Sequence, residues 1–292
     1  MKKSPGDKAF NVANMVVLTL LAAFCLAPFL HLVAVSFSSA SAATSGRVAL
    51  WPVEFTTAAY RQALKGERVT ASLLMSLLRV LAGVGTNIGL LLLTAYPLSK
   101  SNDRLPGRSF FSWYFMITML IGGGLIPTYL VVMQTGLLDT IWALVLPGAI
   151  SAYNLTIVLN FFRGIPQSLE ECALIDGANH IQILLKIFVP LSTPVIATMT
   201  IFCTVTHWND WFSGLIYMGS QSRYPLMTYL QTIITTPDYS AMDSMTLEAL
   251  SQVSNKTFQA AQILIATLPV LVIYPFCQKY FVTGLTLGSV KG

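Results

Sequence analysis

The sequence has very few charged residues for its length. Of its 292 residues, 10% are charged and 54% are hydrophobic, and the mean hydropathy is +0.67. A soluble globular protein usually carries about 25% charged residues. The composition therefore excludes an ordinary soluble domain and indicates a protein that resides in a lipid bilayer.

Cysteine and clustered basic residues are also scarce. The net charge is only +5, and the longest basic run is Lys2-Lys3, which excludes a nucleic-acid-binding surface. Wide spacing of the cysteines supports neither a disulfide framework nor a CxxC metal site. The four cysteines are Cys25, Cys172, Cys203 and Cys277.

The chain lacks the motifs of common nucleotide-binding and hydrolytic sites. It contains no GxxxxGK(S/T) phosphate loop, no HExxH zinc motif and no GxSxG nucleophile motif. We therefore expect no enzymatic activity, no metal site and no cofactor in this chain, and any chemical energy must come from a partner.

Six stretches are long and apolar enough to cross a membrane as helices. A helix needs about 20 apolar residues to cross about 30 Å of hydrocarbon, because backbone groups left unpaired in lipid cost several kcal/mol each. We therefore predict an all-α, polytopic bundle of six transmembrane helices. The predicted spans are residues 12–35, 71–98, 109–132, 141–162, 191–215 and 260–281.

The distribution of lysine and arginine predicts the orientation of these spans. The short connection 99–108 alone holds Lys100, Arg104 and Arg108, on the same side as the N-terminus. The positive-inside rule therefore places both termini in the cytoplasm. The predicted organisation is a cytoplasmic N-terminus 1–11, a membrane domain 12–282 with external loops 36–70 and 216–259 and an internal loop 163–190, and a cytoplasmic tail 283–292.

A cleaved signal peptide is an alternative interpretation of the N-terminus. Lys2 and Lys3 precede an apolar run, and Ala40-Ser41-Ala42 resembles a small-residue cleavage site. The apolar run, residues 12–35, is much longer than the 7 to 15 residues of a typical signal core. We therefore expect the first span to be retained.

The internal loop contains a predicted amphipathic helix. Ser168, with Glu171 three residues later, predicts a capping box at its N-terminus, where acidic residues also suit the helix dipole. Leu169 and Ala173 lie on one apolar stripe that needs cover, either from a partner or from the bundle and the lipid surface. Gly177 allows a tight turn after the helix.

The spacing in this loop resembles the EAA signature of the membrane subunits of bacterial ABC importers. Glu171-Cys172-Ala173 is followed by Gly177, by Ile187 and by Phe188-Val189-Pro190; Cys172 and Val189 stand where Ala and Leu are usual. Matching segments run from about residue 70 to the end and look most like permeases for complex oligosaccharides and uronic-acid polymers. They are Gly123–Tyr129, Gly136–Pro147, His207–Asn209, Tyr224–Leu226 and Thr283–Gly292.

The resemblance implies a type I ABC importer permease in the bacterial inner membrane. Its partners would be a second homologous permease, two copies of a cytoplasmic ABC ATPase that bind ATP and magnesium, and an extracytoplasmic solute-binding protein. The carbohydrate substrate would be an alginate-like or pectin-derived oligosaccharide.

The resemblance also implies that the loop forms a coupling helix that docks on the ATPase, and that the C-terminal tail reaches between the ATPases. Glu171 is the residue expected to meet a cation of the ATPase. Carried over to this chain, the docking residues are Glu170, Glu171, Ala173, Leu174, Asp176 and Gly177, with tail contacts from Ser289 and Lys291.

A path for carbohydrate needs aromatic faces and neutral hydrogen-bonding groups. Among the candidates, Trp208 has an alternative role in the belt of aromatic residues at the membrane surface, and Asn154 has an alternative role as a hydrogen-bonding bridge between helices. An anionic sugar would explain Arg79, but residues 80–98 nearly span by themselves, so we expect Arg79 to snorkel to the outer surface. The candidates are Arg79, Asn87, Tyr153, Asn154, His207, Trp208 and Asn209.

An ion-coupled secondary transporter is the main functional alternative. Such transporters place acidic groups or broken-helix ion sites near the middle of the membrane. No Asp or Glu lies in the middle of a predicted span, and Asp210 falls near an outer end. The sequence therefore favours the importer, with a non-transporting membrane receptor or scaffold as a third possibility.

Overall fold

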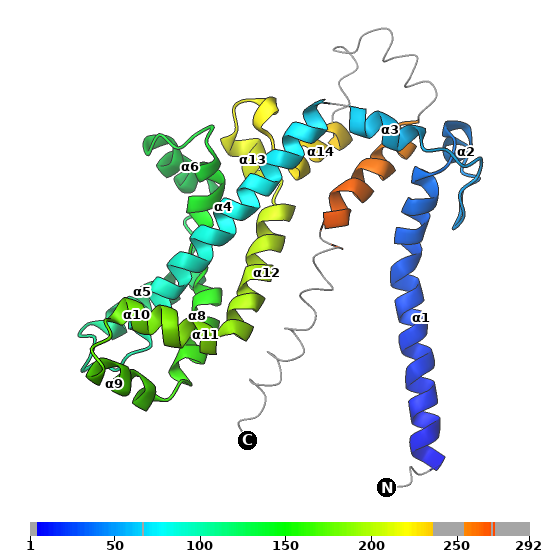
Figure 1. Cartoon of the computed structure of the whole chain (residues 1–292). Helices are drawn as coiled ribbons and strands as arrows, with labels where there is room; N and C mark the ends of the chain where they lie inside the picture. The colour runs from blue at the N-terminus through cyan, green and yellow to red at the C-terminus, as the bar shows by residue number, and fades with distance from the viewer. Residues whose placement is uncertain (1–4, 66, 236–253, 270, 272–292) are drawn as a thin grey trace. The chain divides into compact units, whose positions relative to one another are not determined.

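A computed structural model of the chain describes residues 5–65, 67–235, 254–269 and 271 (Figure 1). Every regular element in these ranges is a helix, as the sequence predicts. The chain divides into two compact units, Met1–Thr70 with Thr232–Leu268 and Ala71–Gln231 with Pro269–Gly292. Each unit is described by itself.

The first unit begins with a long helix whose apolar side chains are exposed. Helix α1 (Pro5–Ser36) continues through Pro28, and the apolar stretch Phe10–Ser36 buries none of its most hydrophobic window inside the protein. This exposure fits the first predicted span, since apolar side chains without protein neighbours need lipid. Short helices α2 (Ala40–Thr44) and α3 (Ala58–Lys65) occupy the predicted loop 36–70.

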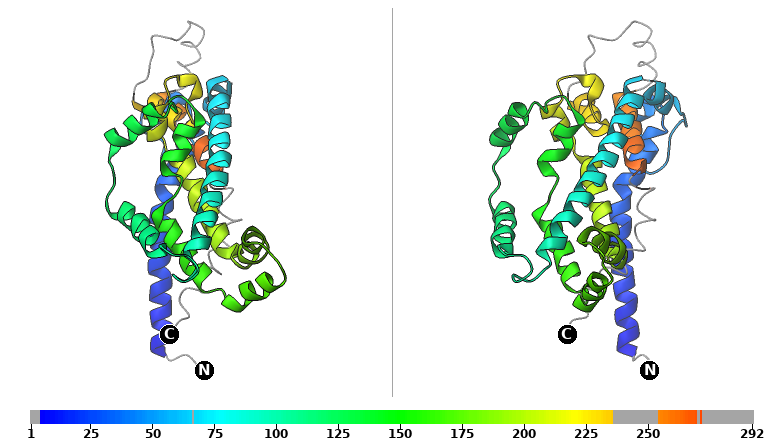
Figure 2. Two further views of the ribbon diagram at one scale, coloured as in Figure 1. Left: turned by 90° about the vertical axis from the view of Figure 1, so that its left-hand side faces the viewer. Right: turned by 60° about the vertical axis from the view of Figure 1, so that its left-hand side comes forward.

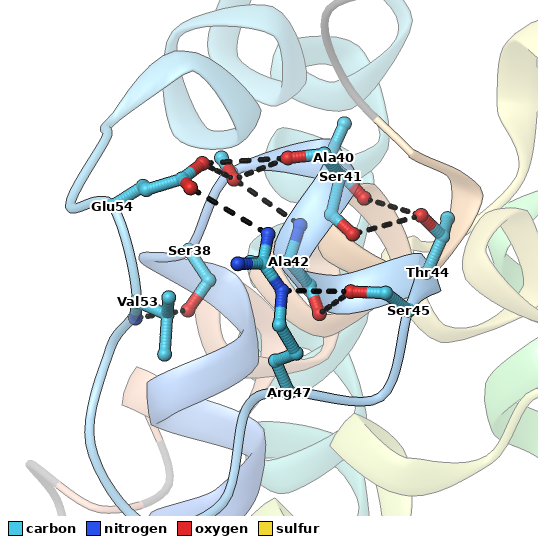
Figure 3. Close-up of polar contacts among 10 residues, drawn as sticks. Ser38, Ala40, Ser41, Ala42, Thr44, Ser45, Arg47, Val53 and Glu54 are labelled. Atoms are coloured by element: carbon cyan, nitrogen blue, oxygen red, sulfur yellow. Dashed lines mark hydrogen bonds and ion pairs between the residues drawn. The ribbon is translucent and has the colours of Figure 1, made fainter.

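A polar network organises the segment after α1 (Figure 3). Ser39 is the N-cap of α2, and its hydroxyl donates to Glu54, which also forms an ion pair with Arg47 at 3.6 Å. Ser38 Oγ accepts the Val53 N–H at 3.0 Å. The hydrogen bond from Ser39, followed by the charge of Arg47, lowers the pKa of Glu54.

The second unit is a bundle in which α4, α8 and α12 run along its length (Figures 1 and 2). Helices α9, α10 and α11 gather at one end of this unit, and α6 and α13 lie at the other (Figure 1). The elements are α4 (Glu67–Leu98), α5 (Arg108–Leu120), α6 (Leu125–Gln134), α7 (Ile141–Val145), a 3-10 turn (Leu146–Gly148), α8 (Ala152–Arg163), α9 (Gln167–Ile175), α10 (His180–Ile183), a π-helix (Leu184–Phe188), α11 (Val189–Leu191), α12 (Thr193–Asn209), α13 (Phe212–Tyr217), a 3-10 turn (Gln221–Arg223) and α14 (Leu226–Thr235).

Two of the predicted spans contain a bend, and a third begins at one. The stretch 109–132 is broken into α5 and α6 at an angle of 119°. Gly124, at the start of α6, has φ 81° and ψ 174°, a conformation reserved for glycine. The predicted helix 141–162 bends by 57° at a 3-10 turn that begins beside Pro147. The predicted fifth span starts two residues later than expected, at α12, after a bend of 86° from His180–Leu191.

The number of possible spans depends on how the bent helix pairs are counted. Within the described part of the chain, two helices are long and apolar enough to cross a membrane, and up to five spans result if each bent pair counts as one. The sixth predicted span, 260–281, extends beyond the described residues, and its described part is helical up to residue 269.

One hydrophobic cluster of the second unit lies near α9. Buried side chains of α4, α8, the π-helix and α12 pack together there. Phe162 and Phe188 meet edge to face at 5.2 Å between ring centroids, and Tyr96 meets Phe188 in the same way at 5.0 Å. Aromatic edge-to-face packing fixes these helix ends against one another, so α9 sits on a rigid base.

Candidate functional site

Helix α9 is bounded by two tight turns. Pro166 occupies its N-cap position and gives no side-chain hydrogen bond, so the capping box predicted at Ser168 and Glu171 is wrong; the fixed φ of proline starts the helix instead. At the other end the Gly177 N–H donates to Leu174 O at 3.0 Å and the Ala178 N–H to Ala173 O at 2.9 Å. This is a Schellman motif, and it requires the left-handed φ of 83° that Gly177 adopts.

Glu170 attaches the buried side of α9 to the rest of the second unit. Its side chain is 4% exposed, and its carboxylate accepts hydrogen bonds from Lys100 Nζ at 2.7 Å and from Tyr96 Oη at 3.2 Å. Arg104 Nη1 lies 3.7 Å from the same carboxylate. Through these three partners Glu170 holds α9 to the end of α4 and to the segment after it, and removal of one partner of such a buried pair is strongly destabilising.

Lys100 is the other half of this attachment. Its ammonium group lies 3.8 Å from the ring centroid of Tyr96 and 4.3 Å from that of Phe188. Burial lowers the pKa of Lys100, and the hydrogen bond to Glu170 acts in the opposite direction. Two aromatic faces and a carboxylate therefore replace the water that the ammonium group loses.

Glu171 has a different environment from its neighbour. Its side chain is half exposed, and its carboxylate accepts from Arg104 Nη2 at 2.8 Å and from Gln167 Nε2 at 2.9 Å. Glu171 was expected to meet a cation on the ATPase; within the chain, Arg104 already fills that role. An exposed pair of this kind is weak, at about 0 to 1 kcal/mol, so Glu171 can exchange Arg104 for a partner's cation.

The predicted docking residues divide between two sides of α9. Glu170 faces the interior and Ala173 packs against the core, whereas Leu174, Asp176 and Gly177 are exposed together with Glu171. The helix also exposes apolar side chains that were not among the predicted docking residues. They are Leu169, at 42% exposed, and Ile175, at 86%.

A cavity of about 650 Å³ lies between α4, α9 and α10. Tyr96, Lys100 and Glu170 form its polar part, and Leu93 and Leu174 belong to its apolar wall. Tyr96 Oη also lies 3.1 Å from His180 Nδ1. The cavity therefore lies directly beside the contacts that hold α9.

The helix-embedded candidates were expected to line a sugar path. Arg79 was expected to snorkel, and that expectation is wrong. Its side chain is 1% exposed, and its guanidinium group pairs with the Asp210 carboxylate and donates to Asp210 O at 2.7 Å. Arg79 also lies 3.4 Å from Leu144 O. Because α12 ends at Asn209, Asp210 and its free carbonyl face α4, which gives Arg79 acceptors inside the protein.

Asn87 and His207 continue this contact between α4 and α12. Asn87 Nδ2 lies 3.1 Å from His207 Nε2, and His207 is 6% exposed. Gly83 permits the close approach, because a Cβ atom there would lie 2.4 Å from His207 Nε2. Among the described residues, the buried Asn87 Oδ1 has no hydrogen-bond partner.

The remaining path candidates do not join this cluster. Tyr153 is 57% exposed, and Asn154 is half-buried in the first turn of α8, where Ser151 Oγ accepts its N–H at 3.4 Å. Trp208 is 3% exposed, which rules out the interfacial belt, and Asn209 is exposed. The structure thus unites Arg79, Asn87 and His207 with Asp210, a residue that was not among the predicted site residues.

The two predicted tail residues, Ser289 and Lys291, lie outside the residues that the structure describes. Their contact with an ATPase therefore stays a prediction.

Comparisons with known proteins agree with the resemblance of the loop. A permease of Bacillus subtilis (strain 168), the polygalacturonan/rhamnogalacturonan transport system permease protein YtcP, is 40% identical over 98% of this chain and 99% of its own length. Protein LplC of the same organism is 37% identical over 100% of this chain and 98% of its own length.

A solved structure has the same fold. It is a chain of a bacterial ABC transporter involved in the import of the acidic polysaccharide alginate, with a TM-score of 0.89 and 33% identity, covering 96% of this chain and 99% of the other. The family model for binding-protein-dependent transport system inner membrane components matches residues 106–286, which include α9 and the rest of the predicted internal loop. The chain therefore belongs to the family of binding-protein-dependent transport system inner membrane components, as a carbohydrate ABC transporter permease.

Proposed function

We propose that this chain is one of two permease subunits of an ATP-driven importer in the bacterial inner membrane. It spans the membrane six times with both termini in the cytoplasm. An extracytoplasmic binding protein delivers the substrate, and two cytoplasmic ATPases bind ATP and magnesium. The chain itself forms part of the path for the substrate and transmits the movement of the ATPases to the membrane helices.

The observation that carries this proposal is the arrangement of α9. Ile175 is 86% exposed at the end of a helix whose other side is fixed by Glu170. Leu169 adds a second exposed apolar side chain. Exposed apolar residues on a rigidly held helix suit a groove on a partner, because little side-chain and backbone entropy is lost on docking.

The attachment of α9 suggests how movement reaches the membrane. Glu170 binds Lys100 and contacts Arg104, and both follow the end of α4 directly. When closure of the ATPase dimer displaces α9, these contacts transmit the displacement to α4. Helix α4 in turn is joined to α12 through Arg79 and Asp210, so the displacement extends along the bundle.

The proposed substrate is an oligosaccharide that contains uronic acids. The support comes from two similar proteins, a permease of a polygalacturonan/rhamnogalacturonan transport system and a chain of an alginate importer, since polygalacturonan and alginate are both polymers of uronic acids. Asn87, Tyr153, Asn154 and Asn209 remain proposed contacts. Arg79 is neutralised by Asp210, so we assign it a structural role and not direct binding of an anionic sugar.

Cys172 offers a direct test of docking, because it is a natural cysteine exposed on α9. A reagent with one thiol-reactive and one photoreactive end, attached to Cys172 in inside-out vesicles of the assembled transporter, should crosslink the chain to the ATPase on illumination, and Cys172→Ser should abolish the product. If Cys172 is labelled only from the outside, or no ATPase is captured, the docking role is wrong.

Transport itself tests the energy source. Proteoliposomes that contain the assembled transporter should accumulate labelled oligogalacturonate only with its binding protein outside and ATP within. Accumulation driven by a sodium or proton gradient without the ATPases would instead support the ion-coupled alternative. A receptor or scaffold would show neither uptake nor stimulation of ATP hydrolysis by substrate.

A further inference from the structure

A second cavity, of about 440 Å³, lies between α5 and α8 and is lined along most of the length of both helices. Most of its wall is hydrocarbon or aromatic. No residue of α5 as a whole is in the buried class, so the apolar side chains that α5 contributes to the wall are at least partly exposed. The apolar residues of the wall are Leu98, Trp113, Phe115, Met116, Met119, Leu155 and Leu159.

Two arginines stand at the polar end of this cavity. Arg108 is the first residue of α5 and Arg163 is the last residue of α8, and both line the cavity. The charge of Arg108 acts unfavourably on that of Arg163. Two guanidinium groups that face one space, with no acid between them, attract an anion.

Neither arginine is neutralised within the described part of the chain. Lys100 and Arg104, nearby, form ion pairs with Glu170 and Glu171, but no described acid forms one with Arg108 or Arg163. Arg108 Nη1 donates to Lys100 O at 3.0 Å, whereas Arg108 Nε and Ser112 Oγ are buried without a described partner. These unpaired donors need an acceptor, since an unsatisfied buried polar group costs about 1 to 3 kcal/mol.

The arginines and the apolar wall together select the ligand. We propose that the cavity binds one anionic phospholipid, with its phosphate between Arg108 and Arg163 and an acyl chain along α5 and α8. Basic pockets between helices at a membrane surface bind lipid headgroups in this way. A carbohydrate would leave its hydroxyls without partners against the aliphatic side chains of Met116, Met119 and Leu155, and a nucleotide would leave its polar base edges there.

The proposal does not depend on transport activity or on the orientation of the chain. It requires only that the ends of α5 and α8 reach the membrane surface, where phosphate and acyl chain are both available. A failure of the docking role of α9 would therefore leave the lipid site untouched.

Native mass spectrometry can test the site on the full chain purified with its partner subunits. We expect one phosphatidylglycerol to remain bound where phosphatidylcholine does not. Arg108→Gln and Arg163→Gln should each weaken retention about five-fold, since one cation near an anionic lipid contributes that much. Arg163→Lys, which keeps the charge, should retain most of the binding. Arg61→Gln removes an exposed arginine of α3 and should have no effect.

Two further measurements distinguish a bound lipid from a free anion. Met116→Glu places a charge on the apolar wall and should displace phosphatidylglycerol with both arginines intact. Inorganic phosphate at millimolar concentration should not compete with the lipid. The proposal is overturned if both arginine variants retain phosphatidylglycerol as the unmodified protein does, or if phosphate alone displaces it and Met116→Glu does not.

Discussion

Arg79 on α4 and Asp210 at the end of α12 form an ion pair between residues 131 positions apart in the sequence. Arg79 is 1% exposed, and its two Nη atoms reach the Asp210 carboxylate, Asp210 O and Leu144 O, whereas its buried Nε has no partner among the described residues. Asp210 also accepts the Ser213 N–H at 3.1 Å, which orders the turn into α13. One contact therefore fixes both the distance between two helices and the bend after one of them.

Asp210→Asn should destabilise the protein strongly. The substitution keeps an acceptor for Ser213 but leaves the Arg79 charge buried without its counter-ion, which costs about 3 to 5 kcal/mol. Thermal unfolding of the purified protein in detergent measures the effect. In the double variant Arg79→Met with Asp210→Asn, most of the stability should return, because no unpaired charge remains. If the double variant is as unstable as the single one, the ion pair is not the cause.

Gly83→Ala should separate α4 from α12. The added Cβ would meet the His207 ring at 2.4 Å, closer than real Cβ contacts, and overpacking of this kind costs about 1 to 3 kcal/mol. Gly85→Ala is the matched control, because a Cβ there meets no atom within 4 Å. Melting temperatures of the two variants give the comparison. Equal melting temperatures would show that His207 moves aside without cost.

Glu170→Gln and Glu171→Gln should differ, although the two residues are adjacent. Loss of the Glu170 charge leaves the buried Lys100 without its acid and should destabilise the attachment of α9 by about 3 kcal/mol or more. The exposed pair of Glu171 with Arg104 contributes at most about 1 kcal/mol. Melting temperature and ATP-driven uptake should both fall for Glu170→Gln, with uptake reduced at least about tenfold.

The same measurements test which acid meets the partner. Because Glu171 can exchange Arg104 for a cation of the ATPase, Glu171→Gln should weaken association with the ATPase while the melting temperature of the isolated chain stays unchanged. A large fall in that melting temperature would contradict the surface role of Glu171.

Gly177→Ala should impair import without removing the protein from the membrane. Gly177 has φ 83°, and an alanine in this region costs about 1 to 2 kcal/mol, so the turn that ends α9 shifts or frays. Gly177→Asn is the control, since asparagine tolerates the left-handed region better. Uptake by proteoliposomes, corrected for the amount of protein inserted, should rank the unmodified protein above Gly177→Asn and Gly177→Ala lowest. The reverse order of the variants would exclude backbone strain.

Acid should loosen the segment after α1. The hydrogen bond from Ser39 and the charge of Arg47 lower the pKa of Glu54 (Figure 3), so its contribution is fully present above the unfolded pKa, near 4.3. That contribution is lost as the pH falls through the lowered pKa of the folded state. Amide hydrogen exchange over residues 38–54, corrected for intrinsic rates, should accelerate below about pH 4. Glu54→Gln should remove this dependence on pH.

Several features of the site follow from local sequence. Gly177 was predicted to form a tight turn after a helix, and it does so in a Schellman motif. The predicted start of the same helix was wrong. Ser168 and Glu171 match the pattern of a capping box, but Pro166 occupies the N-cap position and fixes the backbone there. At this helix end the fixed φ of Pro166 outweighs the side-chain pattern that follows it.

Sequence alone determined that the chain belongs in a bilayer, that it is helical, and that its internal loop carries the family's motif. These properties depend on composition and on residues close together in the chain. Only the tertiary structure decided that Glu170 faces inward while Glu171 faces out, that Arg79 finds Asp210 instead of the outer surface, and that Arg108 and Arg163 share one cavity. Each of these facts depends on which helices pack together, and helical periodicity carries no information about the partner that a distant segment will supply.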